Sequence, residues 1–310
     1  MNSEHKNNNE LPVIQYGVKE LIELLWSSKL IIIVTTLLFA LASVFYSLQL
    51  NNVYKADVVL ESARNSESSL GKSAAQLGQL ASLAGFAFPG GGQDSTATDL
   101  AIMESRQFLS AFIANNDLLV PLFAGTGWDF ATESLIINNE IYDESKDKWL
   151  RKVKVPLQPK PSAQEAVTQF KEHMEVVHDR LTGLVYVSIE YYSPTYAKNW
   201  LSNLVVELNL YVKNKEVALI NANIAYLEKQ AEAMDNAGMK AVFYRLLEEQ
   251  QKKVMLALSS DEYVFKTIDP AVIPEKKSGP KRAIICVLGT FAGFFLSIVF
   301  VLLRVYFKGN

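Results

Sequence analysis

The sequence contains very little of the chemistry that enzymes and metal proteins use. Among its 310 residues are one cysteine, Cys286, and three histidines. A single thiol cannot build a disulfide framework or a zinc cluster. His173 and His178 are five residues apart, so they do not share a helical face. No HExxH, GxSxG or supported acid pair occurs. We therefore predict no catalytic residue, no cofactor site and no metal site.

The sequence also lacks a strong excess of charge. Its net charge is −3 at pH 7, which gives no argument for nucleic acid binding. One stretch, 66–73 (SESSLGKS), resembles a phosphate-binding loop. Serine takes the place of the first glycine of that motif, and no clear hydrophobic strand comes directly before it. We therefore assign no nucleotide site.

Two uncharged apolar runs, 30–50 and 283–303, lie near the ends of the sequence. An α-helix needs about 20 such residues to cross the ~30 Å hydrocarbon core of a bilayer. A cleaved signal peptide is the rival interpretation of the first run, because 40–42 (ALA) imitates a cleavage box. The run continues eight residues past Ala42, however. We predict two transmembrane helices, with tails 1–29 and 304–310 on one side of the membrane and residues 51–282 on the other.

Basic residues flank both runs on both sides, so they do not settle the orientation. Lysines and arginines in the two tails compete with a cluster at 276–282 on the loop side. Long loops translocate largely regardless of charge, which weakens this comparison. The cluster can meet lipid head groups or an anionic glycolipid. The plain alternative is that these are solvated charges beside a span.

Small residues and prolines mark the second run and its approach. Gly289, Gly293 and Ser297 are spaced four apart, and such residues let membrane helices approach closely. We predict that they pack against a neighbouring span or a partner protein. Proline fixes φ and has no backbone donor, so the approach segment 270–280 should be extended and stiff. Its prolines, predicted to couple the loop to the membrane, are Pro270, Pro274 and Pro280.

Between the runs, the pattern predicts a modest α/β domain. Alternating stretches at 53–60, 184–191 and 262–268 are typical of strands. Residues 98–115 have helical spacing, and Ser162 with Glu165 forms a capping box for a helix to about residue 177. We also expect a short amphipathic helix at 18–26, a short helix within 64–84 and a flexible glycine loop at 86–94. The fold class is therefore α+β with two membrane helices.

The longest predicted element is a helix over 194–236. Ser193 and Pro194 are a strong helix start, and no further glycine or proline occurs before Gly238. At 1.5 Å per residue the helix is about 60 Å long. We predict that it packs against a return helix at 239–258 and against copies of itself; the alternative is an intramolecular hairpin alone. Its apolar stripes, predicted to form the oligomer helix, contain Leu201, Leu204, Leu208, Ile220, Ile224 and Leu227.

The order of these features resembles that of the bacterial O-antigen chain-length regulators, the Wzz-type polysaccharide co-polymerases. The resemblance covers nearly the whole chain, with two terminal spans around one large loop. The individual motifs are weak, but their order and spacing are specific. They are 161–166 (PSAQEA), 182–185 (TGLV), 193–200 (SPTYAKNW), 223–228 (NIAYLE) and 270–282, which leads into the glycine-containing span.

The resemblance implies a bacterial inner-membrane protein with both termini in the cytoplasm and the loop in the periplasm. An α/β base with a long helix would assemble into a homo-oligomeric ring or bell. Acting with the O-antigen polymerase, it would set how many repeat units are added to a lipid-linked polysaccharide, without catalytic residues. Some relatives carry a tyrosine-kinase domain after the second span, which we do not expect here, since the sequence ends at Asn310.

Two other functions stay open. One is a co-polymerase for capsule or exopolysaccharide export, working with a separate kinase. The other is a membrane-bound sensor or adaptor with a ligand-binding periplasmic domain. The short tails, which offer no signalling domain, count against the sensor.

Overall fold

The computed structural model describes residues 26–63, 95–233 and 236–308. The expectations for 18–25, 64–84 and 86–94, including the loop-like motif at 66–73, lie outside these residues. The chain forms two compact units. One combines residues 1–51 with 279–310, and the other is residues 52–278.

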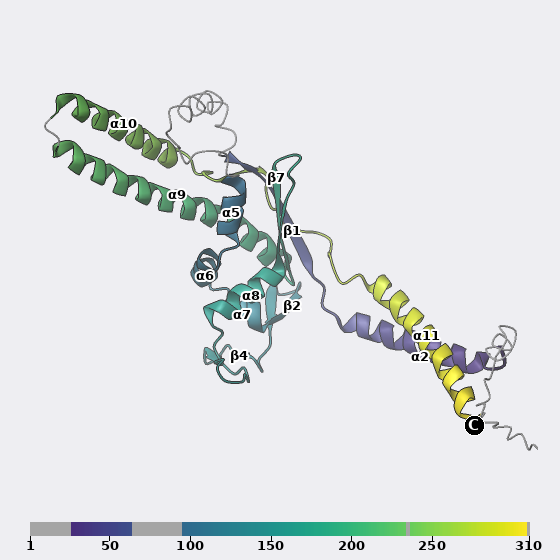
Figure 1. The fold of residues 1–310 in the computed structure, drawn as a ribbon. Helices are drawn as coiled ribbons and strands as arrows, with labels where there is room; N and C mark the ends of the chain where they lie inside the picture. The colour runs from purple at the N-terminus through teal and green to yellow at the C-terminus, as the bar shows by residue number, and fades with distance from the viewer. Residues whose placement is uncertain (1–25, 64–94, 234–235, 309–310) are drawn as a thin grey trace, which may run out of the picture. The chain divides into compact units, whose positions relative to one another are not determined.

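A four-stranded antiparallel sheet organises the larger unit (Figure 1). Its order is β6-β7-β1-β8, from β6 (Met174–His178), β7 (Leu184–Tyr191), β1 (Tyr54–Ser62) and β8 (Phe265–Asp269). In the register Val58 lies opposite Val187. Successive strand residues face opposite sides, so every second side chain of β1 and β7 is buried. The strand predicted at 184–191 is confirmed.

Short helices cover one face of this sheet and close the core. They are α5 (Ser95–Met103), α6 (Arg106–Asn115), α7 (Leu119–Ala124) and α8 (Ala163–His173). The fully buried Phe108, Phe112 and Phe170 belong to the same hydrophobic core as the inward-facing sheet residues. The single helix predicted over 98–115 is wrong. Ser105 has an extended backbone and its hydroxyl accepts a hydrogen bond from the Phe108 N–H, so it starts a second helix.

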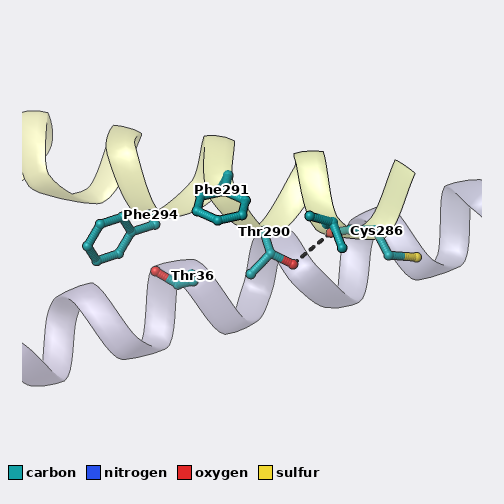
Figure 2. A pocket seen from close by; sticks show the side chains of 6 residues that line it. Thr36, Cys286, Thr290, Phe291 and Phe294 are labelled. Atoms are coloured by element: carbon teal, nitrogen blue, oxygen red, sulfur yellow. Dashed lines mark hydrogen bonds between the residues drawn. The ribbon is translucent and has the colours of Figure 1, made fainter. Parts of the chain in front are cut away.

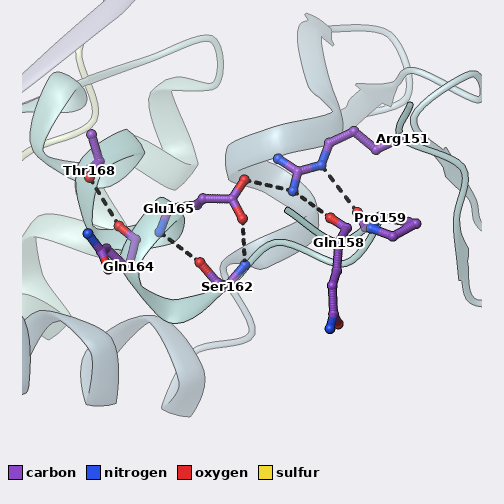
Figure 3. Close-up of polar contacts among 7 residues, drawn as sticks. All are labelled: Arg151, Gln158, Pro159, Ser162, Gln164, Glu165 and Thr168. Carbon is purple, nitrogen blue, oxygen red and sulfur yellow. Dashed lines mark hydrogen bonds and ion pairs between the residues drawn. The ribbon is translucent and has the colours of Figure 1, made fainter. Parts of the chain in front are cut away.

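The capping box predicted for α8 is confirmed, and Figure 3 shows its surroundings. Arg151 reaches it from the connector that follows the two short hairpins, β2 (Gly125–Asp129) with β3 (Ser134–Ile137) and β4 (Tyr142–Asp143) with β5 (Lys148–Trp149). Its guanidinium lies 2.7 Å from the Glu165 carboxylate and donates to the carbonyls of Gln158 and Pro159. This fixes the connector against the helix start.

The end predicted for the same helix is wrong. α8 stops at His173, and Met174 takes extended angles and begins β6. Val176 and Val177 are β-branched, which favours a strand, and they pair with Val187 and Tyr186 of β7. Tertiary pairing with the sheet therefore ends the helix four residues early.

Two long helices form a hairpin that extends away from the sheet (Figure 1). α9 (Pro194–Glu232) starts where predicted, because the Ser193 hydroxyl accepts a hydrogen bond from the Tyr196 N–H. α10 (Ala237–Ser259) returns along it. The N-terminal part of α9 is part of the sheet's core, and the chain re-enters the sheet as β8.

The smaller unit is a pair of apolar helices, α2 (Lys29–Gln49) and α11 (Arg282–Lys308). Both are long and apolar enough to cross a membrane. Their most apolar windows are only 6% and 17% buried, whereas a core helix of a soluble protein is mostly buried. The fold is thus α+β, with an apolar helix near each end of the chain and one extended helix, as the sequence predicts.

Candidate functional site

The part of the chain described by the structure offers no metal centre, because no group of three His, Cys, Asp or Glu residues there could hold an ion. The hydrogen bonds between distant parts of the chain are concentrated where the hairpin leaves the sheet. We call Asn209, Lys213 and the segment 260–265 the hairpin seat.

Asn209 holds the hairpin seat together. It lies on α9, is 3% exposed, and uses both ends of its amide. Its Oδ1 accepts from the N–H groups of Val264 and Phe265, at 2.7 and 3.0 Å. Its Nδ2 donates to the carbonyls of Val205 and Phe265. One side chain therefore joins the long helix to the start of β8.

Lys213 repeats this contact one turn further along α9. Its ammonium donates to the Ser260 carbonyl at 3.0 Å and lies 3.6 Å from the Asp261 carboxylate, while its stem is buried. The Asp261 side chain is fully exposed, so this ion pair contributes little. The partly buried hydrogen bond to Ser260 fixes the chain as it leaves α10. We did not predict the seat, although an asparagine and a lysine four residues apart on the buried side of the helix were visible in the sequence.

An aromatic cluster fixes the start of α9. Tyr191, at the end of β7, packs with its ring 4.4 Å from that of Trp200 and donates its hydroxyl to the Pro121 carbonyl at 2.7 Å. Burial raises the pKa of Tyr191, and it stays neutral. His173 packs edge-on against the same ring, and burial lowers its pKa. Both groups have a packing role here.

The structure divides the predicted oligomer helix residues into two sets. Leu201, Leu204 and Leu208 are fully buried in the protomer's own core. In the single chain the sheet and its short helices cover this stripe. Ile220 is also buried, and Ile224 and Leu227 are partly covered, where α9 runs along α10.

Other apolar residues of the hairpin remain open to solvent, and we call them the hairpin flanks. They lie on both helices and include large side chains that are more than half exposed. On α9 they are Val206, Leu210, Leu219 and Tyr226, and on α10 they are Val242, Tyr244, Leu246, Met255, Leu256 and Leu258.

The small residues of the second apolar helix pack against the first one in the same chain. A Cβ added at Gly289 would overlap Ser43, and one added at Gly293 would overlap Phe39. Ser297 is buried and donates back to the Phe294 carbonyl. The neighbouring span at this face is α2 of the same chain.

The proline segment leaves the larger unit as an extended chain without regular structure. Ala271, beside Pro270, is buried at the edge of the core. Ser278 donates its N–H to the Val53 carbonyl at 2.9 Å, so the outgoing chain is tied to the incoming one. Pro274 and Pro280 are partly buried on either side of this contact.

Comparisons with known proteins place two family models on the chain. The Wzz model, described as chain length determinant protein, matches residues 17–116, and the GNVR model, described as a G-rich domain on putative tyrosine kinase, matches residues 233–306. A search of curated proteins found no match.

Solved structures with weak similarity include a full-length bacterial polysaccharide co-polymerase, at 12% identity and a TM-score of 0.37, covering 95% of this chain and 99% of that one. Another is a fragment of WzzB, a polysaccharide co-polymerase from Salmonella Typhimurium, at 11% identity and a TM-score of 0.30, covering 74% and 100%. The assignment rests on the two models, which contain the two apolar helices and together cover more than half of the sequence. The chain thus contains a Wzz chain length determinant domain over residues 17–116 and a GNVR domain over residues 233–306.

Proposed function

We propose that this protein sets the length of the O-antigen polysaccharide of lipopolysaccharide, as a non-catalytic scaffold of several copies acting with the O-antigen polymerase. The match of the chain length determinant model to residues 17–116 carries this proposal. The fold supports it, because the buried hydrogen bonds of Asn209 position a long helical hairpin.

In this proposal α2 and α11 cross the inner membrane, both termini lie in the cytoplasm, and residues 51–282 lie in the periplasm. The high exposure of apolar side chains on both helices supports a lipid surrounding. The packing of Gly289 and Gly293 on α2 argues that the first helix is retained rather than cleaved as a signal peptide. The lipid-linked polysaccharide would reach the scaffold from this membrane.

Copies would assemble through the hairpin flanks. At about 100° per residue, Val242, Leu246 and Leu256 lie on one side of α10. Tyr244, Met255 and Leu258 lie on the opposite side, and the buried Leu247 and Ala257 face α9 between them. Apolar residues on both sides suit a head-to-tail contact, in which one flank meets the other flank of the next copy and the series closes as a ring.

The proline segment would act as a stiff coupling between scaffold and membrane. Alanine frees the φ angle that proline fixes, so replacing Pro274 or Pro280 with alanine should change the distribution of O-antigen lengths. The measurement is the ladder of lipopolysaccharide bands on a gel. An unchanged ladder with both variants would remove this role.

The test of the function itself is a deletion strain complemented with this chain and read as a lipopolysaccharide ladder. We expect the deletion to broaden the ladder and the chain to restore a preferred length. If the ladder is the same in all three strains, the protein does not regulate O-antigen.

A second candidate, favoured by the GNVR match and its kinase-associated description, is regulation of capsule or exopolysaccharide length. The same strains distinguish it. In that case the deletion would change the size of the exported polysaccharide on a sizing column and leave the lipopolysaccharide ladder as it was.

A further inference from the structure

A groove runs along α11 where α2 and α11 pack together (Figure 2). It has a volume of about 530 Å³, which is within the usual range for small-molecule sites. Five residues of α11 line it, and one residue of α2 contributes to its wall. They are Cys286, Val287, Thr290, Phe291 and Phe294 on α11, and Thr36 on α2.

The groove surface is almost entirely apolar. Two hydroxyls line it. The Thr290 Oγ1 donates back to the Cys286 carbonyl at 2.7 Å, as Figure 2 shows, and the buried Thr36 Oγ1 makes no hydrogen bond among the described residues. The walls are then the aromatic faces of Phe291 and Phe294 and aliphatic groups. A hydrocarbon chain suits such walls, whereas a sugar or peptide would leave its polar groups without partners.

The groove has the depth of one membrane leaflet. Cys286 and Phe294 are eight residues apart, so the lined part of α11 is about 12 Å long at 1.5 Å per residue. Half of a ~30 Å hydrocarbon core is about 15 Å. Its shallow end begins one turn after Arg282, the first residue of α11. A lipid in the groove would therefore have its head group at the level of Arg282.

Two cationic side chains, Arg282 and Lys281, lie at the expected depth of the lipid head group. Arg282 is held over the end of α2, since its Nη2 donates to the Leu50 carbonyl at 3.2 Å. The Lys281 side chain is exposed and has no ion pair with the residues that the structure describes. Basic groups at the mouth of a gap between membrane helices recognise lipid phosphates. The groove thus combines an apolar lining with two positive charges at its shallow end.

We propose that this groove seats the hydrocarbon tail of the phosphate-linked lipid that carries the growing polysaccharide, with the phosphate at Lys281 and Arg282. The inference rests on the proposed function for the identity of the glycan. One groove accepts one tail, so the part of a single tail next to the phosphate fills it, while a two-tailed phospholipid leaves one tail outside. The protein would in this way hold its substrate by the lipid end.

The test uses the purified full chain in mild detergent, titrated with a long-chain polyprenyl phosphate and observed by native mass spectrometry. Val287→Trp fills the groove, and Leu288→Trp places the same ring on the neighbouring exposed position outside it. Lys281→Gln removes a cation without touching the helix packing. We expect one lipid per chain, bound about tenfold more weakly by V287W and by K281Q. The L288W variant should bind as the unmodified chain does.

Two further ligands identify the chemistry. Polyprenol, which lacks the phosphate, and phosphatidylglycerol, which has two tails, should each bind more weakly than polyprenyl phosphate. Equal binding of phosphatidylglycerol would overturn the proposal in favour of a site for bulk anionic lipid. Equal binding by V287W and L288W would also overturn it. If V287W does not fold, the K281Q and polyprenol titrations decide.

These measurements are independent of the polysaccharide that the cell makes. If the deletion strain keeps its ladder, the proposed function fails whether or not the lipid binds. If the ladder depends on the protein but V287W binds polyprenyl phosphate normally, only the groove inference fails.

Discussion

Replacing Asn209 with leucine should detach the hairpin from the sheet more effectively than any other single change at the hairpin seat. The leucine keeps much of the volume but provides no hydrogen bond. The Val264 and Phe265 N–H groups would lose the Asn209 acceptor, and both residues are fully buried. Each buried donor left without a partner costs about 1–3 kcal/mol. We therefore expect the N209L variant to lose about 2–6 kcal/mol of stability at this contact.

The assay is hydrogen–deuterium exchange by mass spectrometry on the full chain in detergent. A loss of about 3 kcal/mol corresponds to an acceleration of roughly 100-fold or more in peptides that contain residues 262–267. Asn221→Leu is the matched control, because Asn221 is exposed on the same helix. It should change stability by less than about 0.5 kcal/mol. Equal protection of β8 in N209L and N221L would refute the reasoning.

Three further predictions concern other contacts. Gly293→Leu should lower the thermal stability of the full chain in detergent, because the new side chain would overlap Phe39 of α2. It should also shift the O-antigen ladder without abolishing the glycan. The control Leu288→Ile, at an exposed position of the same helix, should do neither. Hydrogen bonds from the Ser162 N–H and then from Arg151 lower the pKa of Glu165 in the folded chain. The stability that this carboxylate contributes is therefore complete above its unfolded pKa of about 4.3 and is lost as the pH falls through the lower folded pKa. The difference in melting temperature between the unmodified chain and E165Q should shrink below about pH 4, and a constant difference would contradict this. Leu219→Glu, on an exposed flank, should reduce the mass of the assembly on a sizing column, and an unchanged mass would exclude that flank position from the contact.

Local patterns predicted much of the fold. The alternation of apolar and polar residues predicted β7, and the Ser193–Pro194 pair predicted the start of α9. Both signals depend only on residues that are neighbours in the sequence. The ends of elements were less predictable. The end of α8 depends on β6 joining β7, and the break at Ser105 depends on a cap that an otherwise helical spacing conceals.

Partners were the least predictable feature. The stripe at Leu201 and Leu204 suggested contacts with copies of the chain, and the small face at Gly289 suggested a neighbouring span or another protein. Such a face indicates that packing occurs but does not identify the partner. The structure uses both within one chain. Asn209 was overlooked because one polar residue in an apolar stripe has meaning only when its distant partners, Val264 and Phe265, are known.

The most direct test of the scaffold account is the mass of the full chain in its assembled form, measured by light scattering in detergent and again in lipid nanodiscs. The account predicts a discrete species of several copies in both surroundings. A stable monomer in both would contradict it, because the two flanks of a single chain lie on opposite sides of its hairpin and cannot meet each other.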